Sequence, residues 1–479
     1  MSLIKNIILN YKNPNGISQP ISIKKLELTL VILSSFLMGI WAVKETIGLR
    51  NILLVCGTLY SIKYIAQEWL NGDFKKYFTI WKALPILLLA LTFVWVCTHY
   101  LFFSVDSANQ FSELRSTWLR SLMASIIGFA TGLALRNHPN RLILLWLGLC
   151  IAFLILFYQY VPRAITQKKL LVPDYDHYLF HLKFNAVMMG MLLIAGTKGA
   201  LLDHFRSTQC RWSNWSILIL FSYTLSTSMV LWAFVYIIDT RNGIGLSFIF
   251  FGFWFVITLF IFMRSQRLKS NVSGKLNILI SGIGMSLIIF FVILQTNVTK
   301  SWNTLFQDVK IAVQIDRYNN WENLAQLGYP KGEGDHEVSR NTYERVAWAV
   351  AGSRAIILYP QGVGLLAYPY EKHPNAASKK EAVPKNPRIS THSGWVELGL
   401  AFGIPMLSLI FSALLLIFIE AARYEYPARM TALGFVLMTT FLYTFVELYT
   451  DHCVEILFFM LALMPALLLT KPIRIDENA

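Results

Sequence analysis

A histidine at the end of a long polar segment is the residue best placed for chemistry in this chain. His392 follows the polar stretch 297–391 and stands at the mouth of the next apolar segment. An imidazole titrates near neutral pH, so His392 can take a proton from a hydroxyl group as a general base. The alternative is a histidine that caps a helix or anchors it at an interface. Glu397 lies inside the apolar segment, where we expect it to face the protein interior and pair with a cation.

Arginines form the second group of candidates. Arginine keeps its charge and grips phosphate oxygens with a planar fork, so a set of arginines suits a phosphate or diphosphate. For the arginines of the polar stretch, the alternative is a solvated helix face with ion pairs to Glu337 or Glu344. The candidates are Arg163, Arg241, Arg340, Arg345 and Arg354.

A possible metal site is the third candidate. Asp174 and Asp176 form a short acidic motif, and His181 follows in the next apolar segment. Carboxylates and imidazoles can hold a divalent ion, although ion pairs with nearby basic residues explain the same aspartates equally simply. His181 and Lys183 are also expected to line the cavity used by the arginines. The sequence contains no zinc-protease, phosphate-loop or dinucleotide-binding motif.

The composition indicates which elements position these residues. The chain has 479 residues, of which 55% are hydrophobic and only 14% charged, and its mean hydropathy is +0.51. A membrane-spanning helix needs about 20 mostly apolar residues. We predict an all-α polytopic membrane protein of about twelve spans. The predicted spans are 26–43, 49–66, 83–104, 117–135, 142–160, 179–201, 215–238, 243–263, 276–296, 393–419, 430–449 and 453–470.

The polar stretch divides the chain into three parts. Residues 1–296 and 392–479 are membrane segments, and residues 297–391 form one large loop domain. Apolar residues at helical spacing predict helices near 305–327 and 340–358 of this loop. We therefore expect a small, partly helical cap over the mouth of the helix bundle.

The basic residues predict the orientation, because lysine and arginine concentrate in cytoplasmic loops. One set of loops holds most of them, from the N-terminal lysines to Lys471 and Arg474. Both termini are then cytoplasmic, and the large loop faces outward, into the periplasm if the cell is Gram-negative. Arg163 and Arg241 run against this bias. For Arg241, in a tight turn between two spans, this favours an anionic ligand on the outer face. For Arg163 such a ligand and an ordinary ion pair, as with Asp174, explain the charge equally well. The net charge of +15 follows from the same bias and gives no support for nucleic-acid binding.

Three groups of short motifs lie within about residues 236–410. They are Asp239-Thr240-Arg241-Asn242-Gly243, Arg345 with Trp348 and Pro360-Gln361-Gly362-Val363-Gly364, and His392-Ser393-Gly394-Trp395-Val396-Glu397-Leu398 with Gly403-Ile404-Pro405. In order and spacing they resemble the motifs of one known family, the O-antigen ligase and polymerase superfamily. The chain departs from the pattern in having Asn242 before the glycine of the turn. The arginine–tryptophan spacing also leaves Arg340 as a rival to Arg345.

The resemblance implies a membrane glycosyltransferase that uses a glycan linked to undecaprenyl diphosphate. In an O-antigen ligase the acceptor is lipid A–core, and the transfer is inverting and independent of metal. His392 would be the general base, Arg241 and Arg345 would hold the diphosphate with help from Arg163, and Glu397 would orient or balance the site. No cofactor is expected, and Mg²⁺ at Asp174 and Asp176 is the weaker alternative.

Other functions remain open from the sequence alone. An O-antigen polymerase would use another lipid-linked glycan as acceptor, and a protein O-oligosaccharyltransferase would use a protein hydroxyl. A transporter of lipid-linked glycans would need ionisable residues through the middle of the membrane. Here the ionisable residues are expected near the outer ends of the spans, which disfavours transport.

Overall fold

The computed structural model is built from helices over the residues that it describes. It describes residues 21–70, 76–173, 179–180, 182–208, 213–266, 282–294, 304–322, 324–332, 337–372, 390–448 and 451–472. Within these ranges the chain forms no β-strand, and an isolated antiparallel bridge joins Lys331 and Glu337. The prediction of an all-α chain is therefore confirmed for the described residues.

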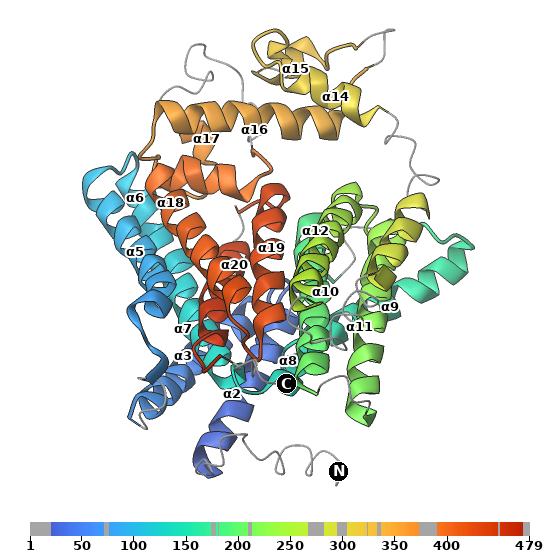
Figure 1. Ribbon diagram of the computed structural model, residues 1–479. Coiled ribbons are helices and arrows are strands. Elements are labelled where there is room, and N and C mark those ends of the chain that lie inside the picture. The colour runs from blue at the N-terminus through green and yellow to red at the C-terminus, as the bar shows by residue number, and fades with distance from the viewer. Residues whose placement is uncertain are drawn as a thin grey trace.

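Each predicted apolar segment overlaps a helix of the structure (Figure 1). Short helices α6 (Ser107–Glu113) and α8 (Leu142–Leu145) lead into two of them. In chain order the main helices are α2 (Ile21–Ile40), α3 (Ile47–Leu70), α5 (Ile80–Phe102), α7 (Leu119–Leu135), α9 (Leu147–Gln167), α10 (Lys183–Ser207), α11 (Asn214–Trp232), α12 (Arg241–Gln266), a helix at Gly282–Leu294, α18 (Gly394–Arg423), α19 (Arg429–Phe445) and α20 (Asp451–Leu467).

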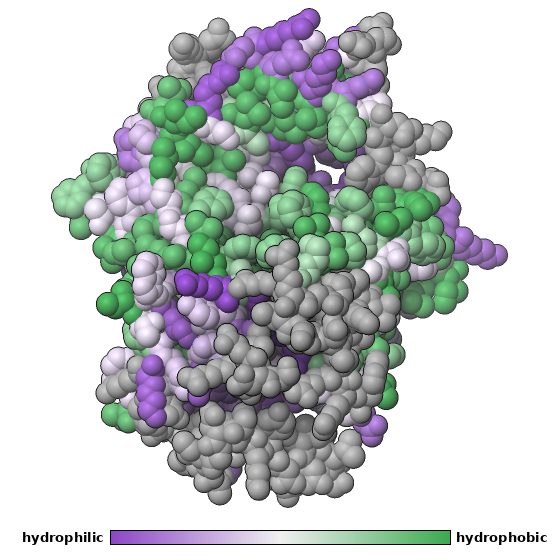
Figure 2. Space-filling model, viewed as in Figure 1, coloured by the Kyte–Doolittle hydropathy of each residue, from purple (hydrophilic) through white to green (hydrophobic). Residues whose placement is uncertain are grey.

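Within the described residues, seven helical segments are long and apolar enough to cross a membrane. Figure 2 shows apolar side chains as a belt across the bundle, with hydrophilic ones at the top edge of the molecule and others below the belt. This distribution defines a helical membrane protein. The seven segments are Ile80–Phe102, Ser107–Leu135, Pro139–Gln167, Lys183–Ser207, Asn214–Ile237, Arg241–Phe260 and Gly394–Arg423.

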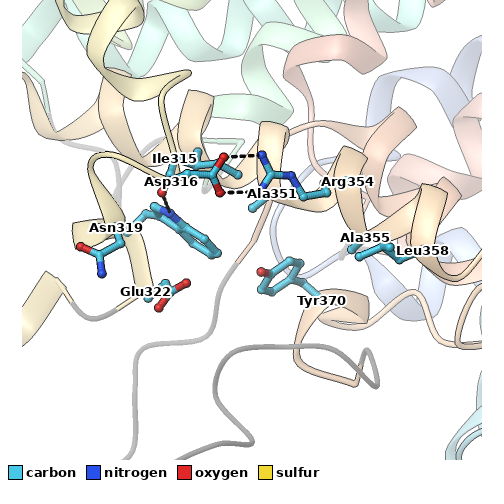
Figure 3. A pocket seen from close by; sticks show the side chains of 10 residues that line it. Ile315, Asp316, Asn319, Glu322, Ala351, Arg354, Ala355, Leu358 and Tyr370 are labelled. Atoms are coloured by element: carbon cyan, nitrogen blue, oxygen red, sulfur yellow. Dashed lines mark hydrogen bonds and ion pairs between the residues drawn. The ribbon is translucent and has the colours of Figure 1, made fainter.

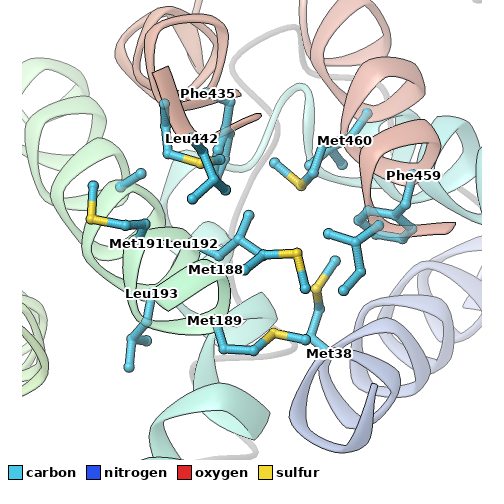
Figure 4. Packing of buried hydrophobic residues seen from close by; sticks show 14 of the residues in the cluster. Met38, Met188, Met189, Met191, Leu192, Leu193, Phe435, Leu442, Phe459 and Met460 are labelled. Carbon is cyan, nitrogen blue, oxygen red and sulfur yellow. The ribbon is translucent and has the colours of Figure 1, made fainter. Parts of the chain in front are cut away.

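Helix α10 is the centre of the bundle. Its most apolar stretch is 100% buried, and the helix packs against α11 and α19. Figure 4 shows Met188 and Met189 of α10 facing Met38 of α2 and Met460 of α20. Methionine side chains are flexible and fill irregular gaps between helices. Packing on all sides fixes α10, and with it the position of Lys183 at its first turn.

The pair formed by α7 and α20 is packed most closely. A Cβ atom on Gly128 or Gly132 of α7 would overlap the backbone of α20 at Phe459 and Leu463. Small residues let helices approach closely in a bilayer, where apolar burial gives little driving force between helices. These glycines therefore allow the backbone contact that joins the two helices.

The segment after Gly282–Leu294 forms a cap across one end of the bundle (Figure 1). Its helices are α14 (Leu305–Ala312), α15 (Leu324–Leu327), α16 (Arg340–Leu358) and α17 (Pro369–Lys372). Helix α16 matches the predicted helix 340–358. The predicted helix near 305–327 is instead divided into α14, a 3₁₀ turn at Asn319–Glu322 and α15.

The cap has its own apolar core. Trp321, Tyr343, Trp348 and Tyr370 pack together, and Leu400 of α18 completes the cluster. Aromatic side chains bury large areas, so a few of them stabilise a small domain. The contribution of Leu400 fixes the cap to the bundle.

Helix α18 is kinked beneath the cap. Gly403 has φ 72° and ψ −171°, a conformation essentially restricted to glycine, and Pro405 has no N–H to donate. In an unbroken helix the carbonyls of Leu400 and Ala401 would accept from residues 404 and 405. The kink therefore leaves backbone groups that need other partners, because unpaired backbone groups are costly inside a membrane.

The turn after α16 supplies those partners. Val363 N–H donates to Leu400 O at 2.9 Å, and Gly364 N–H donates to Ala401 O at 2.6 Å. In return, Ile404 N–H donates to Pro360 O at 2.8 Å. The Pro360–Gly364 turn thus replaces the missing helical hydrogen bonds and ties the cap to α18.

Substitution of Gly403 by alanine should destabilise the protein by about 3 kcal/mol or more, because alanine does not tolerate this backbone conformation. The new Cβ would also overlap the carbonyl oxygen of Pro360. Thermal unfolding of the purified protein in detergent measures the change. Gly48→Ala is the matched control, since a Cβ there meets open space. Equal melting temperatures for the two variants would contradict the proposed role of the kink.

Candidate functional site

His392 lies in a strained backbone position just before α18. Its φ is 54°, in the left-handed region, and its N–H donates to Ser390 Oγ at 3.3 Å. A residue other than glycine costs about 1–3 kcal/mol in such a conformation, and this strain is concentrated at functional sites. The strained backbone supports the interpretation that His392 is held in one orientation for a functional reason.

Two side chains orient the His392 ring. Nδ1 is hydrogen-bonded to the carboxylate of Glu447, which follows the end of α19. On its face, the ring stacks on Trp348 of α16 with 5.5 Å between centroids and 20° between planes. A carboxylate accepts the proton on Nδ1, so Nε2 of the neutral ring is the acceptor. The His392 side chain is 21% exposed, which leaves the ring accessible.

Glu397 fixes the backbone around this pair. It is buried as predicted, but its partners in the described structure are the Ser390 hydroxyl and the Leu448 N–H, both at 2.6 Å. The predicted pairing with a cation is not seen among the described residues. Ser390 lies two residues before His392, and Leu448 directly follows Glu447. Through these two hydrogen bonds, Glu397 fixes the backbone beside both members of the imidazole–carboxylate pair.

Arg345 lies on α16, one turn before Trp348 and therefore on the same helix face. The side chain is half-buried. Burial lowers the pKa of its guanidinium, the carboxylate of Glu447 opposes this shift, and the positive charge of Arg241 adds to it. Arg345 thus lies within electrostatic range of both the carboxylate that orients His392 and a second arginine.

Arg241 begins α12 after a tightly constrained turn. Thr240 caps the helix, with its Oγ1 accepting from Gly243 N–H at 3.2 Å, and its own N–H donates to Phe234 O at 2.9 Å. Asp239 has φ 50°, also in the left-handed region. A helix N-terminus attracts anions through its free N–H groups and its dipole. Arg241 adds a full positive charge at this position.

Lys183 brings a third cation to the cluster. It begins α10, and its Nζ donates to the backbone oxygen of Asp239 at 3.1 Å. The charges of Arg241 and Arg345 also act on it. The ends of α10 and α12 and one face of α16 therefore place three basic residues within electrostatic range of one another, and Arg345 also lies within range of the carboxylate that holds the His392 ring. Such an arrangement can bind a multiply charged anion next to a proton acceptor.

The other predicted site residues lie elsewhere or remain predictions. Arg340 is on the solvated face of α16, 73% exposed, with its Nε 3.2 Å from the Glu344 carboxylate. Arg163 is half-buried near the end of α9, and its role remains a prediction. His181, Asp174 and Asp176 lie outside the described residues. In the part of the chain that the structure describes, no three histidine, cysteine, aspartate or glutamate residues group as metal ligands.

The sequence analysis missed Glu447 as the partner of His392. The two residues are 55 positions apart in the chain. The available signal was a carboxylate near the end of the predicted span 430–449, at the same end of the bundle as the histidine. A charged group at that position also fits a side chain that simply reaches for water, so its position alone did not identify the pair.

Comparison with known proteins found no matching family model and no matching curated protein.

Arg345→Ala should weaken the binding of inorganic diphosphate about tenfold or more, because charge-assisted hydrogen bonds contribute most to phosphate recognition. Calorimetry on the purified protein in detergent, without divalent ions, measures this affinity. Arg340→Ala is the control on the same helix and should bind as the wild type does. If Arg340→Ala loses as much affinity for diphosphate as Arg345→Ala, the cation cluster is not the site that binds the anion.

Proposed function

We propose that this chain is an O-antigen ligase, which transfers a glycan from undecaprenyl diphosphate to lipid A–core. One observation carries the proposal: the carboxylate that orients the His392 imidazole lies within electrostatic range of Arg345, which in turn lies within range of Arg241 and Lys183. The motif resemblance supports the same reaction. It predicted His392, Arg241 and Arg345 as one site from three separate stretches of sequence.

The cations suit the leaving group of this reaction. When the bond between the anomeric carbon and the diphosphate breaks, negative charge grows on the diphosphate oxygens. Fixed cations stabilise such charge without rearranging, which lowers the barrier. Arg241 and Arg345 would hold the diphosphate, Lys183 would add charge, and Arg163 remains a further candidate from the sequence.

His392 suits the attacking group. The acceptor is a sugar hydroxyl that loses its proton as its oxygen attacks the anomeric carbon. Nε2 of His392 would take that proton, and the Glu447 carboxylate would stabilise the imidazolium that forms. A single displacement of this kind inverts the configuration at the anomeric carbon. No cofactor is needed for it.

The proposal places the protein in the bacterial inner membrane with the cap in the periplasm. Five further helices, α2, α3, Gly282–Leu294, α19 and α20, would complete twelve spans with the seven long ones. An even number of spans places both termini on one side. Arg136 and Arg206 lie at helix ends remote from the cap, which supports cytoplasmic termini.

The acceptor is the least constrained part of the proposal. A polymerase would extend another lipid-linked glycan, and a protein O-oligosaccharyltransferase would modify a protein hydroxyl. Parallel assays with lipid A–core, a lipid-linked repeat and a pilin-like protein separate the three. Movement of the lipid-linked glycan across a liposome bilayer without any acceptor would instead support a transporter.

His392→Ala should reduce glycan transfer to lipid A–core about 10²–10⁴-fold, because the general base is lost. Glu447→Gln should cause a smaller loss of about tenfold, since a neutral hydrogen bond replaces a charge-assisted one of roughly twice its strength. A reconstituted assay with purified protein measures both rates. Arg340→Ala serves as the control for expression and folding. Transfer at the wild-type rate by His392→Ala would exclude His392 as the base.

Removal of divalent ions with a chelator should leave the transfer rate within about twofold of its starting value, because fixed cations already stabilise the departing diphosphate. The same assay, run with and without added Mg²⁺, measures the effect. A rate that requires Mg²⁺ and is lost in Asp174→Asn and Asp176→Asn would instead support the metal alternative.

A further inference from the structure

A pocket lies in the cap, apart from the cation cluster. It is formed by the C-terminal half of α16, the 3₁₀ turn at Asn319–Glu322 and Tyr370 of α17 (Figure 3). Its volume is about 360 Å³. Small-molecule sites range over roughly 300–1,000 Å³, so this pocket can hold a ligand of one or two rings.

Polar groups line one part of the pocket. Both terminal nitrogens of Arg354 donate to the Asp316 carboxylate, at 2.6 and 2.8 Å. This planar pair still has free lone pairs on the carboxylate for a ligand. Asn319 and Glu322 add an amide and a second carboxylate to the same lining. The pocket therefore offers donors and acceptors together, which suits a ligand with several hydroxyl groups.

Tyr370 adds a hydroxyl from the opposite wall. In Figure 3 its hydroxyl end is turned toward the side of the pocket that carries Glu322. Burial and the charge of Glu322 raise the pKa of Tyr370 to about 12. The hydroxyl therefore remains protonated at physiological pH and can donate to a ligand.

Apolar surface forms the rest of the lining. Trp321 and Tyr370 meet edge to face, with 6.4 Å between ring centroids, and Ala351 and Ala355 of α16 lie beside them. A sugar ring has an apolar face of C–H groups and a rim of hydroxyls. The pocket combines the two matching kinds of surface.

The charge of the lining distinguishes between kinds of sugar. Asp316 and Glu322 contribute two negative charges and Arg354 one positive charge, which gives −2 + 1 = −1. A uronic acid or a phosphorylated sugar would be repelled by this balance. A neutral sugar keeps its hydrogen bonds without such repulsion.

The pocket is connected to the candidate base through one tryptophan. Trp348 Nε1 donates to the backbone oxygen of Trp321, a pocket residue, at 3.4 Å. The ring of the same Trp348 stacks on His392. Along α16, Arg345 and Arg354 are about 14 Å apart at 1.5 Å per residue. A short oligosaccharide can bridge this distance.

We propose that this pocket is a saccharide subsite that binds a neutral sugar unit of a glycan whose reacting end lies at His392. The inference rests on the proposed glycosyl transfer for its biological role, but the binding of sugar is independent of it. The sugar unit belongs either to the donor glycan or to the acceptor, and the experiment below separates these two sources.

The first test is binding without any reaction. Purified protein in detergent is applied to a printed array of neutral, N-acetylated and uronic-acid-containing oligosaccharides of two to six units. Wild type and His392→Ala should both bind neutral oligosaccharides. Tyr370→Phe and Asn319→Ala should each bind about tenfold more weakly, because each loses a hydrogen bond. Ser353→Ala, an exposed neighbour on α16 outside the pocket, is the control and should bind as the wild type does.

Two outcomes of the array would overturn the proposal. One is the absence of saccharide binding by the wild type, or a preference for acidic sugars. The other is binding that is unchanged in Tyr370→Phe and Asn319→Ala. Sugar binding at the pocket by a protein that transfers no glycan would reject the proposed function and keep the subsite.

The second test identifies the source of the sugar. Transfer is compared for lipid diphosphate donors that carry one sugar or a longer glycan, and for acceptors with short or long oligosaccharides. A donor subsite predicts that Tyr370→Phe slows the longer donor about tenfold and leaves the one-sugar donor unchanged. An acceptor subsite predicts the same pattern with acceptor length. Equal effects on all four substrates would show that Tyr370 acts only on folding and would reject the subsite.

Discussion

The exchange of backbone hydrogen bonds between the cap and α18 is the constraint on which the site depends. Gly403 and Pro405 interrupt α18 where the helix enters the bundle, and the Pro360–Gly364 turn supplies the missing partners. Backbone groups at such a depth need a partner inside the protein. The cap is therefore part of the folded bundle. Its attachment also fixes the end of α16, which carries Trp348 and Arg345 toward His392.

The repulsion between the cations of the cluster destabilises the folded protein when no anion is bound. Arg241 and Arg345 repel each other, and the Arg345 guanidinium is partly removed from water. Two like charges that lie close together in a region of low dielectric constant weaken the fold unless an anion separates them. Here the rigid ends of α10 and α12 hold the cations in place. Such fixed charges are useful where negative charge develops during a reaction, because no reorganisation is then needed.

The sequence predicted the helices well because continuous apolar runs have few alternatives in a membrane protein. The order of the short motifs also grouped Arg241 and Arg345 with His392, and the shared role of these residues stays a prediction. The contact with Glu447 could not be predicted, since it depends on how two loops meet. The choice between Arg340 and Arg345 required the direction of each side chain on α16: one is 73% exposed and the other half-buried.

The single helix α16 explains how the cap could serve two binding tasks. Nine residues separate Arg345 from Arg354, which is two and a half turns at 3.6 residues per turn, so the two arginines point to opposite faces. The face of α16 that carries Arg345 is turned toward the cation cluster of the bundle. The face that carries Arg354 lines the pocket, together with residues that follow α14. Because a helix transmits position without bending over this length, a sugar held in the pocket would set where the reacting end of its glycan lies. The geometry of the cap would then select the glycan before any bond is broken.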